Sequence, residues 1–142
     1  MKKSSIRLLM MIVLGLLLTS CSQQNNSIIT ELENKTWELA AIRKSVPIKG
    51  SLINIEFKDG EVHGSSGCNS YFGRYEIKGN EISIGMLAST EMACLDPEGL
   101  MVQEQDYLSF LAEVVSISIE DGQLILRKAV QEQLTFTTSP HG

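Results

Sequence analysis

Two stretches decide the fold: residues 64–75, Gly-Ser-Ser-Gly-Cys-Asn-Ser-Tyr-Phe-Gly-Arg-Tyr, and residues 88–94, Ala-Ser-Thr-Glu-Met-Ala-Cys. Three glycines fall within ten positions of the first stretch, so its backbone must turn, bulge or approach another element closely. Cys68 and Cys94 are the only cysteines after Cys21. This region therefore predicts a bend in a sheet, and the two cysteines lie at its beginning and its end.

Runs in which apolar and polar residues alternate surround this region and are typical of half-buried strands. Asp59-Gly60, Gly79-Asn80 and Asp121-Gly122 separate neighbouring runs and predict tight hairpin turns. Trp37, the only tryptophan, is interpreted as a large core residue. The expected strands cover residues 36–43, 53–57, 62–65, 71–78, 81–85, 116–120, 123–127 and 133–137, and residues 87–93 form a strand or an extended segment.

One helix is expected, from Pro97 to about Val115, because apolar residues recur there at helical spacing. Asp96 is predicted as its N-cap residue, and Pro97 suits the first helical position. The acidic residues near and within it are interpreted as a solvated helix face; they are Glu98, Glu104 and Asp106.

The fold class that follows is mainly β (α+β). We expect an antiparallel meander that curls into an incomplete barrel, with one α-helix packed against it. A sheet of about eight strands usually curls or closes to protect its edges. Strands and helices do not alternate along the chain, so a parallel sheet is not expected.

The N-terminus has the pattern of a secretory signal peptide over residues 1–20. Its basic residues precede an apolar run over residues 8–18, which is too short to span a bilayer comfortably. The small residues directly before Cys21 resemble a bacterial lipoprotein cleavage box. That resemblance implies acylation of Cys21, a lipidated flexible tether over residues 21–31 and a folded domain over residues 32–140.

The same resemblance implies a location. Ser22 follows Cys21 where an aspartate would resemble inner-membrane retention, so the expected site is the outer membrane, facing the periplasm, if the host is Gram-negative. Removing the three basic residues of the signal peptide from the chain's 12 leaves 9 against 17 acidic residues, a net charge of −8. This charge argues against a nucleic-acid partner, and we expect membrane attachment through the acyl chains on Cys21.

The chain resembles the META domain family, which includes heat-shock-associated bacterial lipoproteins, over roughly residues 32–138. The residues that carry the resemblance are Gly67, Cys68, Asn69, Gly73, Tyr75, Thr90, Met92, Ala93 and Cys94, together with Trp37 and the helix that contains Glu104 and Leu108. A basic residue often follows the threonine in the family, whereas this chain has Glu91 there. The resemblance implies a curled sheet with a helix against it, no enzymatic activity and a link to envelope stress or virulence.

Three interpretations of Cys68 and Cys94 stay open: a disulfide, a pair of buried thiols, or a redox or metal site. An extracytoplasmic compartment favours the disulfide, which would stabilise the fold by about 3–4 kcal/mol. The chain has no Cys-x-x-Cys motif, and the only other histidine beside His63 is His141 in the tail, so no metal site is predicted.

Catalytic motifs are not evident. The chain has no Gly-x-Ser-x-Gly motif and no phosphate-binding loop, so no catalytic residue and no cofactor are predicted. The sequence favours a non-enzymatic envelope lipoprotein that binds a protein partner or an apolar ligand in stress resistance or secretion. The alternatives are a thiol-dependent enzyme that uses Cys68 or Cys94, and a purely structural envelope module.

Overall fold

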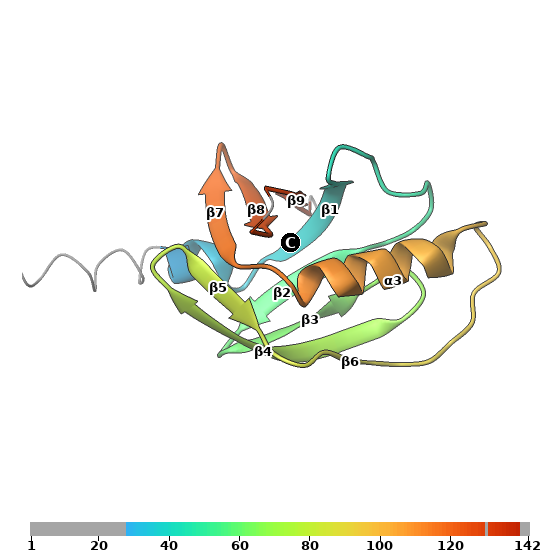
Figure 1. The fold of residues 1–142 in the computed structure, drawn as a ribbon, viewed down its shortest axis with the longest axis horizontal. Helices are drawn as coiled ribbons and strands as arrows, with labels where there is room; N and C mark the ends of the chain where they lie inside the picture. The colour runs from blue at the N-terminus through green and yellow to red at the C-terminus, as the bar shows by residue number, and fades with distance from the viewer. Residues whose placement is uncertain (1–27, 130, 140–142) are drawn as a thin grey trace, which may run out of the picture.

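The computed structural model describes residues 28–129 and 131–139. Within them the chain forms nine strands and one long helix (Figure 1). The elements are β1 (Thr36–Ile42), β2 (Asn54–Lys58), β3 (Glu61–Ser65), β4 (Ser70–Lys78), β5 (Glu81–Ile84), β6 (Ala88–Ser89), α3 (Leu100–Leu111), β7 (Ser116–Glu120), β8 (Gln123–Arg127) and β9 (Gln133–Thr138).

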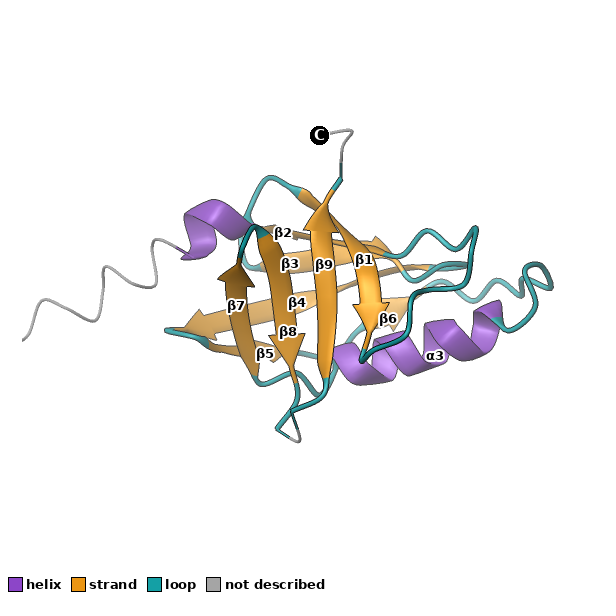
Figure 2. Cartoon of the chain, turned by 90° about the horizontal axis from the view of Figure 1, so that it is seen from above, coloured by secondary structure: helices purple, strands orange, loops and turns teal. Residues whose placement is uncertain are grey.

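The strands form one antiparallel sheet that curls into an incomplete barrel. Its order is β3-β2-β1-β9-β8-β7-β5-β4-β6, and an additional β3–β4 pairing brings the sheet round on itself. The seam between β5 and β7 is the least paired, with Glu81 opposite Ser116 as its one register pair. Figure 2 shows β7, β8, β9 and β1 as one layer in front of β2 to β5, with α3 beside them. The predicted fold class is confirmed.

The predicted hairpins are present. At the turn between β2 and β3, Asp59 has φ +50° and Gly60 has φ +78°. Asp121 and Gly122 between β7 and β8 have φ +51° and +76°. Positive φ at both central residues is typical of the two-residue turns whose twist matches that of the flanking strands.

Strand β1 departs from simple alternation. Trp37 and Leu39 face the core as predicted, but the pairing with β9 shifts between Leu39 and Ala41. Because of this bulge, Ile42 is buried rather than Ala41.

The concave side of the sheet is filled by large side chains. Trp37, Phe57, Tyr107 and Phe136 are all fully buried there, among other aromatic and aliphatic residues of one core. Trp37, 1% exposed, is the core residue that the sequence predicted. The buried face of α3 consists of Leu100, Glu104, Tyr107, Phe110 and Leu111.

A pair of tyrosines connects α3 to the sheet. The Tyr71 hydroxyl in β4 donates to Asn54 O at 2.9 Å and lies 2.7 Å from the Tyr107 hydroxyl in α3. Burial raises the pKa of both phenols, so both keep their protons and both can donate. The pair therefore holds the helix in register on the sheet by polar contacts inside an apolar core.

The predicted start of the helix is wrong. The N-cap residue is Gly99, whose φ of +84° is left-handed, and no side chain caps the helix. Asp96 is therefore not the N-cap, and Glu98 precedes the helix instead of lying in its first turn. A left-handed residue interrupts the helical run that Pro97 would begin, so α3 starts at Leu100. It also ends earlier than expected, at Leu111.

Residues 28–31, the end of the expected tether over residues 21–31, are the only part of it that the structure describes. Residues 28–32 form a helical turn, in which Glu33 N donates to Ile29 O at 2.9 Å. Leu32 is fully buried, and its carbonyl accepts the Trp37 Nε1 hydrogen bond at 3.0 Å. Ile28 packs against the same core, which explains why this segment is ordered. The expectations for residues 1–27 lie outside the described residues.

Gly64 in β3 gives a test of the predicted close approach. A Cβ atom at this position would lie 2.1 Å from Asn54 O in the neighbouring segment, and backbone cannot yield as a flexible side chain can. We expect Gly64→Ala to lower the free energy of unfolding by about 1–3 kcal/mol, measured by urea denaturation.

Gly85→Ala is the matched control, because its Cβ would meet Arg74 O only at 3.6 Å. It should change stability by less than about 0.5 kcal/mol. Equal effects of the two substitutions would contradict the role assigned to Gly64.

Candidate functional site

The family signature forms the connection between β3 and β4. Ser66 N donates to Asn69 O at 2.8 Å and closes a tight loop of four residues. Gly67 has φ +116°, a conformation that side-chain-bearing residues rarely adopt. A Cβ there would also lie 2.9 Å from Leu100 Cδ1 of α3. The turn therefore requires glycine, and a side chain there would also make Leu100 shift.

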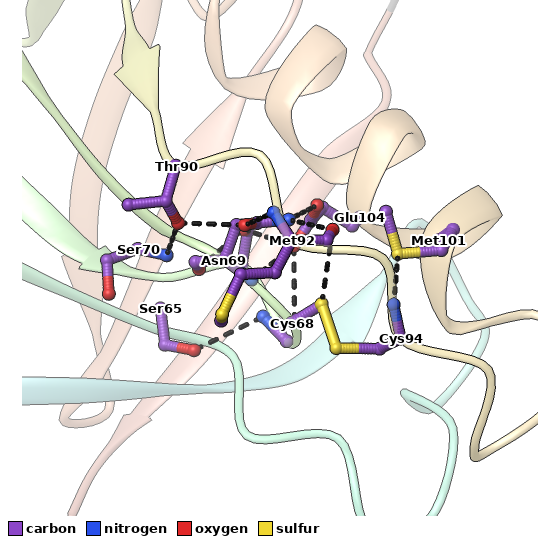
Figure 3. The surroundings of a disulfide bond; sticks show 11 residues. Ser65, Cys68, Asn69, Ser70, Thr90, Met92, Cys94, Met101 and Glu104 are labelled. Carbon is purple, nitrogen blue, oxygen red and sulfur yellow. Dashed lines mark hydrogen bonds between the residues drawn. A yellow bond between two sulfur atoms is a disulfide. The ribbon is translucent and has the colours of Figure 1, made fainter.

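The carboxylate of Glu104 in α3 lies against this loop (Figure 3). Its Oε2 accepts hydrogen bonds from Ser66 Oγ at 2.6 Å, Asn69 N at 2.7 Å and Cys68 N at 3.2 Å. Its Oε1 accepts from Asn69 Nδ2 at 2.6 Å. The four residues form what we call the carboxylate cluster, and Glu104 is only 5% exposed within it.

Two opposing effects set the pKa of Glu104. Burial raises it, while the hydrogen bonds from Ser66, Asn69 and Cys68 lower it, and the net result is a pKa below the ordinary value of 4.5. Glu104 is therefore ionised at neutral pH, with its charge distributed over four donors. Both carboxylate oxygens accept hydrogen bonds from protein groups, three at Oε2 and one at Oε1, so we interpret the cluster as a structural site.

The Asn69 side chain carries this network to the segment after β6. Its Oδ1 accepts from Met92 N at 2.7 Å and Thr90 Oγ1 at 2.8 Å, and its Nδ2 also donates to Met92 O at 3.1 Å. The amide thus pairs with the Met92 backbone as a neighbouring strand would. The Asn69 side chain thus holds residues 90–92 against the β3–β4 loop, together with the hydrogen bonds between Thr90 and Ser70.

Cys68 and Cys94 form a disulfide, with their Cα atoms 5.9 Å apart (Figure 3). Of the three interpretations, the disulfide is the one that the structure contains. It closes a loop with a separation of 26 residues, which corresponds to a stabilisation of about 3–4 kcal/mol in the chain-entropy model. Because both sulfur atoms are bonded to each other, neither is a thiol nucleophile in this structure.

The remaining signature residues lie around this site or support β4. Gly73 leaves room for Leu87, whose Cδ2 would lie 2.8 Å from an added Cβ. Tyr75 packs edge-on against Phe57 and donates its hydroxyl to Glu33 Oε1 at 2.7 Å. Ala93 is exposed between Met92 and Cys94.

Comparison with known proteins identifies the same family as the signature residues. The family model of the META domain matches residues 30–141. The chain belongs to the META domain family. No curated protein matches it.

Solved structures share this META fold. A protein from Burkholderia xenovorans, determined by NMR, has a TM-score of 0.63 and 27% sequence identity over 81% of this chain and 88% of that one. A second NMR structure has a TM-score of 0.61 and 22% identity over 76% and 92% of the two chains. The crystal structure of a DUF4847 family protein from Bacteroides vulgatus has a TM-score of 0.60 and 14% identity over 81% and 99%.

The sequence-based interpretation of Glu104 as part of a solvated face of α3 is wrong. The physical reason is the converging set of donors on the β3–β4 loop, which replaces the water that an exposed carboxylate would bind. The spacing did contain a signal, because Glu104 stands four positions after Leu100 and three before Tyr107, within the buried stripe of α3. Glu98 is exposed as predicted, and Asp106 is partly exposed and paired with Arg43 at 2.7 Å.

The other residues of the META domain that could act in catalysis or metal binding do not lie together with the carboxylate cluster. His63 Nε2 lies 3.4 Å from Glu56 Oε2 on the surface of the sheet. Among residues 28–129 and 131–139, no group of three or more His, Cys, Asp or Glu side chains could hold a metal ion. Within the same ranges, no helix is both long and apolar enough to cross a membrane. Cys21, the predicted lipidation residue, lies outside the described part of the chain.

A surface groove of about 590 Å³ lies between α3 and the loop that follows β1. Its apolar lining includes Val46, Ile48 and Val102. Gln103 holds the two walls together, since its Oε1 accepts from Ile48 N at 2.7 Å and its Nε2 donates to Ser51 Oγ at 2.9 Å. The groove is thus preformed by hydrogen bonds, as binding grooves often are.

The carboxylate cluster gives a stability prediction. Glu104→Gln places an amide NH₂ among donors, so at least one buried N–H loses its acceptor. We expect the free energy of unfolding to fall by about 1–3 kcal/mol in urea denaturation at pH 7. Glu98→Gln, on an exposed carboxylate just before the helix, should change it by less than about 0.5 kcal/mol.

The pKa of Glu104 predicts how this difference depends on pH. Its pKa is lower in the folded state than the ordinary value of 4.5, so its contribution is complete above that value. The contribution is lost as pH falls through the folded-state pKa. The stability gap between the parent and Glu104→Gln should therefore shrink below pH 4.5 in a series of denaturation curves. A gap that stays constant down to pH 2.5 would contradict the charged state assigned to Glu104.

Proposed function

We propose that this chain is a non-enzymatic lipoprotein of the bacterial envelope, anchored by acyl chains on Cys21, whose META domain binds a protein partner in stress resistance or secretion. The sequence support is the signal peptide followed directly by Cys21. The disulfide between Cys68 and Cys94 supports the same compartment, because such bonds persist outside the reducing cytoplasm.

The observation that carries the binding proposal is the preformed groove beside α3. Val46 is 81% exposed and Val102 is 73% exposed, so two apolar side chains of its lining face solvent although polar residues surround them. Exposed apolar surface rimmed by polar residues is typical of protein interaction sites.

The interior of the sheet favours a protein partner over an apolar ligand held in its curve. Large side chains such as Trp37, Phe57 and Phe136 occupy that concave side and are fully buried. An apolar ligand there would have to displace close-packed core residues. The groove outside the sheet needs no such rearrangement.

A thiol-dependent enzyme is the less favoured candidate. Cys68 and Cys94 are joined, and their backbone N–H groups donate to Glu104 and to Met101 Sδ, so no hydrogen bond among the described residues joins either cysteine to a histidine base. General-base activation of a nucleophile needs such a base within hydrogen-bond reach.

The proposal is tested in cells with the full-length chain. A photoreactive residue at position 102 places the probe in the groove, and the same residue at exposed Lys78, on the β4–β5 hairpin, serves as the control. We expect a discrete cross-linked adduct from position 102 that is absent from position 78. The absence of any adduct specific to position 102 would contradict the binding proposal.

The anchor is tested on the same cells. The parent chain should fractionate with the membrane and incorporate radioactive palmitate, whereas Cys21→Ser should do neither. Recovery of the parent chain in the soluble fraction without label would contradict the lipoprotein proposal, whatever the result of cross-linking.

A further inference from the structure

The groove belongs to the end of the molecule where α3 begins. The loop over residues 43–53 and the segment over residues 90–99 both reach this end, and the described chain starts at the opposite end with the helical turn at residue 28 (Figures 1 and 2). If Cys21 carries the anchor, six residues lie between it and residue 28. The end with the groove then faces away from the anchoring bilayer.

Exposed apolar residues are concentrated at this end. Leu95, in the segment that leads to α3, is 92% exposed, and Leu52, in the loop before β2, is 71% exposed. Together with the groove residues Val46 and Val102 they form what we call the distal surface. Several exposed apolar side chains at one end of a domain are typical of an interaction site.

The part of the chain that contains α3 and the segment before it carries only negative charge. Residues 79–126 contain nine Asp and Glu residues and no Lys, Arg or His. Three of these acids, Glu91, Asp96 and Glu98, are exposed on the segment next to Leu95. None of the ion pairs among the described residues includes any of these three acids. The opposite wall carries Lys44 and Lys49, so the negative charge lies on the α3 side.

The negative charge favours some binding partners of the distal surface over others. A second copy of the chain carries the same net negative charge, so long-range like-charge repulsion disfavours it as the occupant. An anionic lipid surface is disfavoured for the same reason. A segment with basic residues on one face and apolar residues on the other satisfies both the exposed apolar side chains and the three unpaired carboxylates.

We propose that the distal surface docks a basic amphipathic segment of a protein partner, with its apolar face in the groove and its cationic side chains on Glu91, Asp96 and Glu98. This inference rests on the proposed binding function and names the chemistry of the partner. The hydrogen bonds of Gln103 hold the groove walls in place before binding, so little ordering of the META domain is needed.

The test uses the full chain in nanodiscs of phosphatidylcholine, with empty nanodiscs as the blank. The probe is a fluorescent helical peptide of lysine and leucine, about 15 residues long, and its counterpart has glutamate in place of lysine. We expect saturable binding of the lysine peptide, weakened by added salt, and no binding of the glutamate peptide. Equal binding of both peptides, or binding that salt does not change, would overturn the proposal.

Two sets of variants locate the binding. The triple variant Glu91→Gln, Asp96→Asn, Glu98→Gln and the double variant Leu95→Ser, Val102→Ser should each weaken lysine-peptide binding roughly tenfold. The charge-matched control is Glu31→Gln, Glu76→Gln, Glu81→Gln, which alters three exposed acids elsewhere and should leave the affinity unchanged. An equal loss in the control would mean that only net charge matters, and would overturn the assigned surface.

Failure of this inference can be distinguished from failure of the proposed function. If the lysine peptide does not bind while position 102 still cross-links in cells, the binding function stands and the basic partner class is wrong. If the chain instead dimerises through this surface, shown by sedimentation and lost in the Leu95→Ser, Val102→Ser variant, the occupant is a second copy and the proposal is overturned.

Discussion

The structure depends on one buried carboxylate. Glu104 accepts hydrogen bonds from Ser66, Cys68 and Asn69, and these donors belong to the loop that joins β3 to β4. An ionised carboxylate away from water is stable only when its hydrogen bonds are replaced, so helix and loop must lie in this arrangement together. Asn69 and the disulfide extend the same arrangement to residues 90–94. The position of α3, and with it one wall of the groove, follows from these contacts.

The residues that define the family signature are thus used for folding, and the candidate binding surface lies elsewhere. The signature loop satisfies its own polar groups, whereas the groove leaves Val46 and Val102 exposed. A family can keep such an internal arrangement while its members present different side chains on the outside. This separation is consistent with structural relatives that share the fold at 14–27% identity.

The strands and turns could be predicted from the local sequence, because their formation depends mainly on neighbouring residues. Asp59-Gly60 and Asp121-Gly122 mark hairpins that the structure contains, and alternation located the strands within a few residues. Two features needed tertiary information. The start of α3 is set by the left-handed conformation of Gly99, which overrides the capping pattern at Asp96. Helical spacing places Glu104 in the buried stripe of α3, but the donors that satisfy its carboxylate lie 35–38 positions away in sequence, and helical periodicity cannot identify them. The groove, likewise, is made by a loop and a helix that the sequence does not connect.

The pairing of β1 with β9 has a consequence for how the chain is made. Trp37 stands opposite Thr138, so the first and last strands are neighbours in one sheet although nearly the whole domain lies between them. Contacts of such long sequence separation form late, because the intervening chain must be ordered before they stabilise it. The sheet cannot be completed while the C-terminal strand is still on the ribosome or, in an exported chain, still inside the translocation channel. A chain that still lacks β9 leaves one edge of β1 without its neighbour, so the complete sheet forms only once the whole domain is available.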